Sequence, residues 1–199
     1  SLTTEANTLT INGSGDITFT GAVGAIDALG AISIDSANDV TANAITAASF
    51  NQAAGTGTTT LNGAVNTTAA AGVTITNAAI VVSNTITTAA SPATGVASGS
   101  ISLTADTTSL PVNGNLTTGD ATVADVTITS ETAVSGNITL SAGTSVTGSG
   151  KLQTGAAEIS GADDTGTDSA TSGSISVTSG TAGTTGEIAL SHDNALVVG

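Results

Sequence analysis

The chain of 199 residues lacks several residue types on which small globular proteins commonly depend. It has no Cys, no Met, no Trp and no Tyr, and its only aromatic side chains are Phe19 and Phe50. The absence of Cys excludes a disulfide framework and a thiolate site. The shortage of aromatics removes the bulky side chains that supply much of the buried area in globular cores. A narrow solenoid, filled by columns of Ala, Val, Ile and Leu, is compatible with this composition.

Basic residues are almost as scarce. The chain carries 15 acidic residues and a single basic residue, Lys151, which gives a net charge of −14 at pH 7. Nucleic-acid binding and adsorption to anionic membranes both require clustered Lys and Arg, so these two functions are excluded. No apolar run reaches the length needed for membrane insertion. The acidity is interpreted as a source of solubility and self-repulsion, with cation binding as the alternative.

The sequence is instead rich in one recurring hexapeptide, typified by Ser135-Gly136-Asn137-Ile138-Thr139-Leu140. A small residue and Gly precede an alternation of apolar and polar residues, which predicts a short β-strand with one buried side. The Gly is interpreted as a turn-permissive residue that opens each strand. Successive glycines of the motif are separated by 42, 42, 37, 37 and 13 residues. The other copies begin at Ser14, Thr56, Ser98, Ser172 and Thr185.

Recurrence of one strand unit predicts a repeat architecture, in which each unit buries its apolar side against the next. Helical periodicity is absent and β-branched residues dominate, so almost no helix is expected. We predict an all-β fold, a right-handed parallel β-helix (β-solenoid) of roughly ten coils of about 18 to 21 residues, two per long interval. An antiparallel sandwich is the structural alternative, disfavoured because two-residue hairpin turns are scarce.

The alternation within the motif assigns particular side chains to the core and places the Ser and Thr residues between them in solvent. A charged residue at any of these inward positions is expected to destabilise the fold strongly. The predicted inward set is Ile17, Phe19, Leu61, Ile101, Leu103, Ile138, Leu140, Ile175 and Val177.

Residues 1–199 are expected to form a single β-solenoid segment. Residues 88–98 contain Pro92, which cannot donate to a β-ladder, and residues 161–172 contain no large apolar side chain. Both stretches are predicted to be loops that project from the solenoid. The first and last strands share an apolar pattern without a capping element. We therefore expect the segment to continue into further coils, either of the same chain or of identical subunits docked end to end.

With these motifs in view, the chain resembles the repetitive shaft of filamentous-haemagglutinin-like adhesins and related large bacterial surface exoproteins. The resemblance rests on the Ser-Gly-x-Ile-x-Leu strands, on the Val-x-x-Asn-x-Ile-Thr strands that start at Val40 and Val81, and on loops such as 162–173. It covers essentially the whole chain. It implies a secreted right-handed β-helix that acts as an extracellular structural rod, either an adhesin shaft or a subunit of a cell-surface filament, with a host or cell-surface ligand as a further partner.

The residues available for catalysis are few. Enzymes that use a parallel β-helix to cleave polysaccharides need paired carboxylates, or a base held near a cation. The acids here are scattered over predicted turns, there is no Arg, and Lys151 and His192 stand alone. No phosphate-binding Gly loop precedes a helix, and no His and Glu have metal-ligand spacing. We expect no enzymatic activity and no catalytic cofactor.

Calcium binding is the alternative function that the acidic residues allow. Ca²⁺ is held by six to eight oxygen atoms, commonly from several carboxylates. Asp163, Asp164 and Asp168 in the loop 161–172 are the candidate ligands, and Asp120 with Asp125 could form a second site. Their spacing matches neither the EF-hand loop nor the nonapeptide calcium repeat. A solvated acidic loop is the simpler interpretation, and a ligand- or calcium-binding module acting through this loop is the alternative to a structural rod.

Thr-x-Thr strands raise one more possibility, because outward Thr ladders on a flat solenoid face can bind ice or ordered water. Thr74-Ile75-Thr76 and Thr127-Ile128-Thr129 have this pattern, but the equivalent Ser33-Ile34-Asp35 does not. The change of interval from 42 to 37 residues is also expected to disrupt a regular lattice. The sequence therefore favours ordinary exposed strand positions occupied by residues of high β-propensity.

Overall fold

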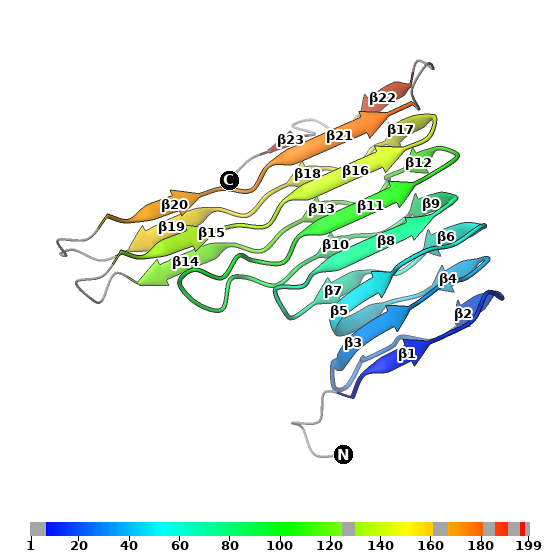
Figure 1. The fold of residues 1–199 in the computed structure, drawn as a ribbon, viewed down its shortest axis with the longest axis horizontal. Coiled ribbons are helices and arrows are strands. Elements are labelled where there is room, and N and C mark those ends of the chain that lie inside the picture. Colours follow the sequence, from blue (N-terminus) through cyan, green and yellow to red (C-terminus); the bar gives the residue numbers. More distant parts are fainter. Residues whose placement is uncertain (1–6, 125–129, 161–166, 181–185, 191–195, 198–199) are drawn as a thin grey trace.

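The structure is a computed structural model that describes residues 7–124, 130–160, 167–180, 186–190 and 196–197. The described residues contain strands and turns and no helix, which confirms the all-β prediction. Every strand pair is parallel, and the partners are successive turns of the chain stacked on one another (Figure 1). The alternative prediction of an antiparallel sandwich is therefore wrong.

The strands lie on three faces and in a lateral arm. The front face contains β1 (Leu9–Ile11), β3 (Leu29–Ile34), the end of β5 (Ile45–Gln52), β8 (Val73–Asn77), β11 (Ile101–Ala105), β16 (Ile138–Ala142) and β21 (Ile175–Ser179). The second face contains β2 (Ile17–Phe19), β4 (Val40–Ala42), β6 (Thr58–Leu61), β9 (Ala79–Val82), β12 (Leu110–Pro111), β17 (Ser145–Gly148) and β22 (Glu187–Leu190). The third face contains the beginning of β5, then β7 (Val65–Thr67), β10 (Ile86–Thr87), β13 (Leu116–Thr117), β18 (Leu152–Gln153) and β23 (Leu196–Val197).

The arm is a set of four strands that leaves the corner between the third and the front face. Its two parallel pairs are β14 (Ala121–Ala124) with β19 (Ala157–Ser160), and β15 (Thr132–Val134) with β20 (Ser169–Thr171). The arm extends to the left in Figure 1, beside the later turns only. β20 falls within residues 161–172, so the end of the predicted loop is a strand, while residues 161–166 lie outside the described part of the chain.

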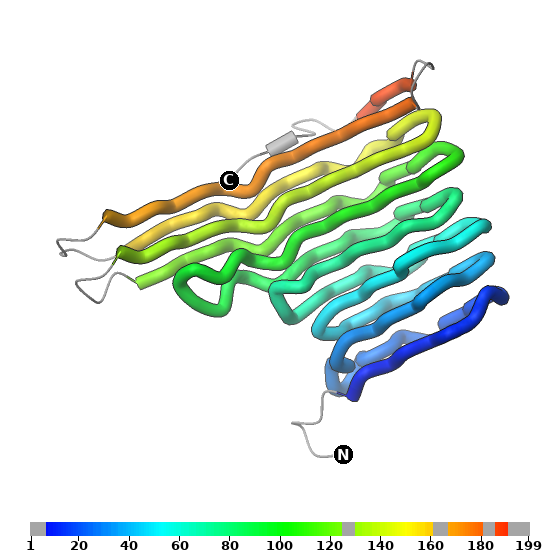
Figure 2. The backbone as a smooth tube through the Cα atoms, viewed as in Figure 1, coloured from blue at the N-terminus to red at the C-terminus, as the bar shows by residue number. Residues whose placement is uncertain are grey.

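Turn length is not constant along the stack. On the front face Leu9 pairs with Ile32, 23 residues later, whereas Ile138 pairs with Ile175, 37 residues later. An interval of 37 residues is therefore one turn, not two. The added residues lie at the corner where the arm leaves, so the turns widen toward one side (Figure 2). The described front face stacks seven strands, and the predicted number of ten coils is not matched.

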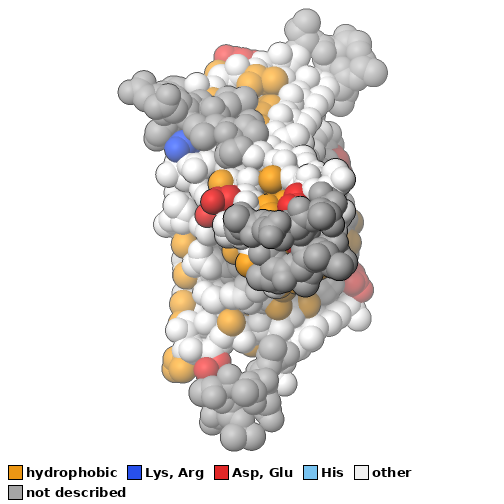
Figure 3. Space-filling model, turned by 90° about the vertical axis from the view of Figure 1, so that its left-hand side faces the viewer, with side chains coloured by type: hydrophobic (Ala, Val, Ile, Leu, Met, Phe, Trp, Pro, Cys, Tyr) orange, Lys and Arg blue, Asp and Glu red, His pale blue; other side chains and the backbone are white. Residues whose placement is uncertain are grey.

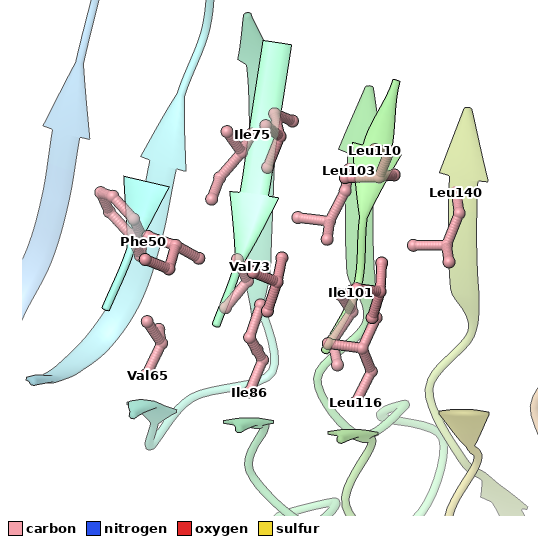
Figure 4. Packing of buried hydrophobic residues seen from close by; sticks show 14 of the residues in the cluster. Phe50, Val65, Val73, Ile75, Ile86, Ile101, Leu103, Leu110, Leu116 and Leu140 are labelled. Atoms are coloured by element: carbon pink, nitrogen blue, oxygen red, sulfur yellow. The ribbon is translucent and has the colours of Figure 1, made fainter. Parts of the chain in front are cut away.

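The core follows the predicted alternation. Ile101, Leu103, Ile138 and Leu140 are fully buried, and Leu61 is buried on the second face. Figure 4 shows Ile101, Leu103 and Leu140 stacked between the faces, together with Phe50 from β5. The remaining members of the predicted inward set are partly buried and pack against the same core, which confirms their orientation: Ile17, Phe19, Ile175 and Val177.

Residues 88–98, predicted to be a projecting loop, instead lie along the arm and bond to one edge of it. We call this segment the edge cover. Residues 92–97 are exposed and form no strand, but the backbone of the segment follows the lower edge of β14 and β15. Its N–H groups donate to carbonyl oxygens of the arm at 2.8 to 3.0 Å, from Ser91 to Asp120, from Gly95 to Thr132 and from Ser98 to Val134. The loop thus satisfies strand-edge groups that would otherwise be open to another chain.

A narrow polar layer separates the arm from the main core. Ser98 Oγ donates to the carbonyl oxygen of Gly119 across the layer and accepts from the N–H of Gly136 in the next turn, both at 2.6 Å. Thr118 Oγ1 repeats this from the opposite side, donating to Gly136 and accepting from Gly155. We call this layer the waist; it divides the main core from a small apolar cluster in the arm.

The waist explains the glycine of the recurring motif. Gly99 and Gly136 lack the positive φ that favours Gly, so their role as turn-permissive residues is a wrong interpretation. A Cβ atom on Gly136 would lie 2.1 Å from the carbonyl oxygen of Gly99, and one on Gly173 would lie 1.9 Å from that of Gly136. At Gly136 and Gly173 the motif therefore requires Gly because the backbones of successive turns approach closely there.

Candidate functional site

The acidic residues predicted to bind calcium are only partly within the described chain. Asp163 and Asp164 lie outside the described residues, and so does Asp125 of the second predicted site. Asp168 is exposed and directly precedes β20, and Asp120 is exposed and directly precedes β14. Both therefore lie in the arm, but at the starts of two strands that do not pair with each other.

The carboxylates of Asp168 and Asp120 each bond to a backbone group of a neighbouring turn. Asp168 Oδ1 accepts from the N–H of Glu131 at 3.0 Å, and Asp120 Oδ1 accepts from the N–H of Ala156 at 2.9 Å. Such charge-assisted bonds cap N–H groups at the points where the strand ladder is interrupted. The arrangement gives these two acids a structural role that requires no metal ion.

The same use of carboxylates recurs on the second face. Asp16 Oδ1 accepts from the side-chain amide of Asn38 at 2.8 Å and from the N–H of Asp39 at 3.2 Å. Asp39 Oδ1 in turn accepts from the N–H of Thr58 at 2.7 Å. The Asn38 amide, and secondarily the Asp39 N–H, hold the pKa of Asp16 below its ordinary value of 3.8.

Replacing Asp16 with Asn should therefore have an effect that depends on pH. Because the pKa of Asp16 is lower in the folded chain, the carboxylate stabilises the fold at pH values above the unfolded pKa, and this contribution is lost as the pH falls through the folded pKa. The group is exposed, so the effect is expected to be small. Thermal midpoints of the wild type and Asp16→Asn, measured across the acidic range, should converge at low pH. A difference that is the same at every pH would contradict this assignment.

Glu131 is a buried acid that the sequence interpretation missed. It is 4% exposed and directly precedes β15, where it alternates with the buried residues Ala133 and Ser135. Its backbone carbonyl accepts from the N–H of Ser169 at 3.0 Å, which joins the two turns of the arm. The alternation of residues 131, 133 and 135 was the signal that could have placed this side chain on the inner side.

Of the two remaining candidates, Lys151 and His192, only Lys151 lies in the described part of the chain. The backbone N–H of the half-buried Lys151 donates to Asn115 Oδ1 at 2.9 Å. His192 lies outside the described residues. A shallow hollow beside the first turn is lined by mainly small and apolar residues, with Ile26 96% exposed and Asp27 as its acid. On the side of the molecule in Figure 3, the acidic side chains lie at separate places.

The described residues contain neither a cluster of metal-ligating side chains nor a membrane-spanning helix. No group of three or more His, Cys, Asp or Glu side chains is placed to hold a metal ion in the described ranges. Within the same residues there is no helix long and apolar enough to cross a membrane.

Comparisons with known proteins add no relative. No protein-family model matches the chain, and neither a curated protein nor a solved structure is significantly similar to it.

Proposed function

We propose that the chain is a non-enzymatic structural rod of the cell exterior, either the shaft of an adhesin or a subunit of a surface filament. The observation that supports this proposal is the continuous ladder of parallel strands along the front face, in which each turn is bonded to the next. Such a stack forms a long and stiff rod, and this role does not require a catalytic or ligand-binding site. Its partners would be further turns of the same chain or identical subunits end to end, and a host or cell-surface ligand.

The same proposal includes the handedness of the fold. Each turn connects parallel strands of one sheet through a crossover, and crossovers of this kind are right-handed in about 98% of cases. A right-handed parallel β-helix is accordingly the expected architecture. Its uncovered strand edges would be filled by neighbouring turns in the assembled rod, because open edges invite uncontrolled pairing.

The location can be tested on the source cells. Antibodies raised against the purified chain should label intact cells, and brief protease treatment of those cells should remove the signal. Labelling only after the cells are permeabilised would contradict the proposal. Electron microscopy of the labelled material should show the antibody along thin projections.

Calcium titration distinguishes the rod from a ligand-binding module acting through the loop 161–172. If the chain is a rod, isothermal titration should give no saturable heat, and the thermal midpoint should not depend on calcium. The informative variant changes Asp163, Asp164 and Asp168 to Asn, because an amide oxygen at position 168 can still accept the N–H of Glu131. Saturable binding that this variant abolishes would favour the module over the rod.

A matched control removes the same number of charges elsewhere. Asp35→Asn, Asp106→Asn and Glu187→Gln change three exposed acids outside the arm. If calcium acts only through general screening of the net charge of −14, both triple variants should respond alike. Specific binding requires that only the arm variant loses the response.

A further inference from the structure

The outer side of the front face carries two adjacent columns of hydroxyl side chains. On β8, β11 and β16 buried residues alternate with outward ones, and on β21 partly buried residues do so. Each of the four strands presents two outward hydroxyls. The register places them above one another over four consecutive turns without a slip. One column is Thr74, Ser102, Thr139 and Ser176, and the other is Thr76, Thr104, Ser141 and Thr178; together we call them the hydroxyl array.

The change of interval from 42 to 37 residues does not disrupt the register of the front face, so this argument against a regular lattice no longer applies. The added residues of the longer turns lie in the arm and its corner, so β11, β16 and β21 stay in register although their turns differ in length from the earlier ones. The array is bounded on the N-terminal side, because the residue below Thr74 in the first column is Asn51, which carries an amide in place of a hydroxyl. The four later turns are thus the regular part.

The array has two repeat distances. Neighbouring strands lie about 4.8 Å apart, and residues i and i+2 of one strand lie about 6.6 Å apart. The result is a two-dimensional net of eight hydroxyl groups, five of them with the Thr methyl group beside the oxygen. Oxygen atoms on the faces of an ice crystal repeat at similar distances in two perpendicular directions.

The hydroxyls of the array are not used by the described part of the protein. Within the described chain none of the eight donates or accepts a side-chain hydrogen bond. The adjacent column behaves differently, since Ser100 Oγ accepts the N–H of Asn137, and Asn137 Oδ1 accepts the N–H and the hydroxyl of Ser174. The array is also uncharged in a molecule whose net charge is −14, so it fits a neutral partner.

We propose that the hydroxyl array binds the surface of ice, by holding a layer of water at the spacing of the crystal. Figure 1 shows the front strands side by side, with no described segment lying over them. The backbone ladders on both edges of β8, β11 and β16 hold the hydroxyls in place, which lowers the ordering cost of binding. A crystalline sugar is less well matched, because Phe50 is buried and Phe19 packs against the core, leaving no aromatic platform.

Growth of single ice crystals in the purified protein tests this proposal. The wild type should shape the crystals, slow recrystallisation and concentrate in the ice fraction. Thr139→Lys places a long charged side chain on the array between Ser102 and Ser176, and should reduce all three readouts to the level of a protein that does not bind ice. Thr87→Lys is the matched control, because Thr87 is an equally exposed strand residue on the third face, and it should behave as the wild type does.

Three outcomes would overturn the proposal. The first is a wild type that neither shapes ice nor partitions into it. The second is equal loss in both Lys variants, which would indicate a non-specific effect of charge. The third is binding to microcrystalline cellulose that depends on Thr139 while ice growth is unaffected, which would assign the array to a sugar surface. None of these results bears on whether the chain is a surface rod, because that proposal is tested on the source cells.

Discussion

Leu140→Asp should prevent the chain from folding stably at ambient temperature. Leu140 is fully buried in β16, where its backbone pairs with Leu103 on one side and Val177 on the other. The substitution removes apolar contacts and leaves a carboxylate without a partner among aliphatic side chains. We expect a loss of about 4 kcal/mol or more in the free energy of unfolding. Urea titration followed by far-ultraviolet circular dichroism measures it.

The adjacent position provides the control. Thr139 is exposed and points away from the core, so Thr139→Asp introduces the same side chain one residue away on the opposite side of the strand. Its cost should not exceed about 1 kcal/mol, the range of β-propensity effects. Equal destabilisation by the two variants would show that the alternation of β16 is shifted by one residue.

The inward and outward sides of the strands could be read from the sequence because a β-strand has a strict period of two. The positions of Ile101 and Leu103 followed from this period alone, and they are fully buried. The location of each strand on a face could not be derived in this way. The motif copies at Ile17 and Leu61 lie on the second face, whereas the copy at Ile138 lies on the front face. Similar local patterns therefore serve different faces.

The arm could not be predicted because its strands lack a strong apolar signal. β20 is exposed along its length, and β14 and β15 contribute only Ala121, Val123 and Ala133 to the small cluster beyond the waist. The sequence therefore predicts a constant coil length, with two coils in each interval of 37 residues, whereas the structure has a single turn of 37 residues. The role of residues 88–98 was missed for the same reason, since an edge cover is recognisable only when the covered edge is known.

The candidate calcium ligands illustrate the limit of residue type as evidence. Asp168 and Asp120 have the chemistry that calcium prefers, and each also accepts a backbone N–H from a neighbouring turn through Oδ1. The sequence specifies the carboxylate but not the partner, because the partner lies 36 or 37 residues away and its position depends on the length of the turn.

Gly136→Ala should destabilise the chain although it adds a single methyl group. The new Cβ would lie 2.1 Å from the carbonyl oxygen of Gly99 and 2.6 Å from its carbonyl carbon. That carbonyl cannot easily move, because it accepts the hydroxyl of Thr88 across the waist. Overpacking against a fixed backbone is expected to cost about 3 kcal/mol. Thermal and urea unfolding measure the loss, and limited proteolysis should cut first in the arm, which the waist joins to the main core.

The first copy of the motif supplies the matched control. Gly15 occupies the same place in Ser14-Gly15-Asp16-Ile17, but a Cβ built on Gly15 meets no atom within 4 Å. Gly15→Ala should therefore change the free energy of unfolding by no more than about 0.5 kcal/mol. If the motif glycines instead served as turn formers, as their recurrence alone indicated, both substitutions would destabilise the chain to a similar extent. A large difference between two identical changes in one motif would show that close approach of stacked backbones, and not turn geometry, selects glycine at position 136.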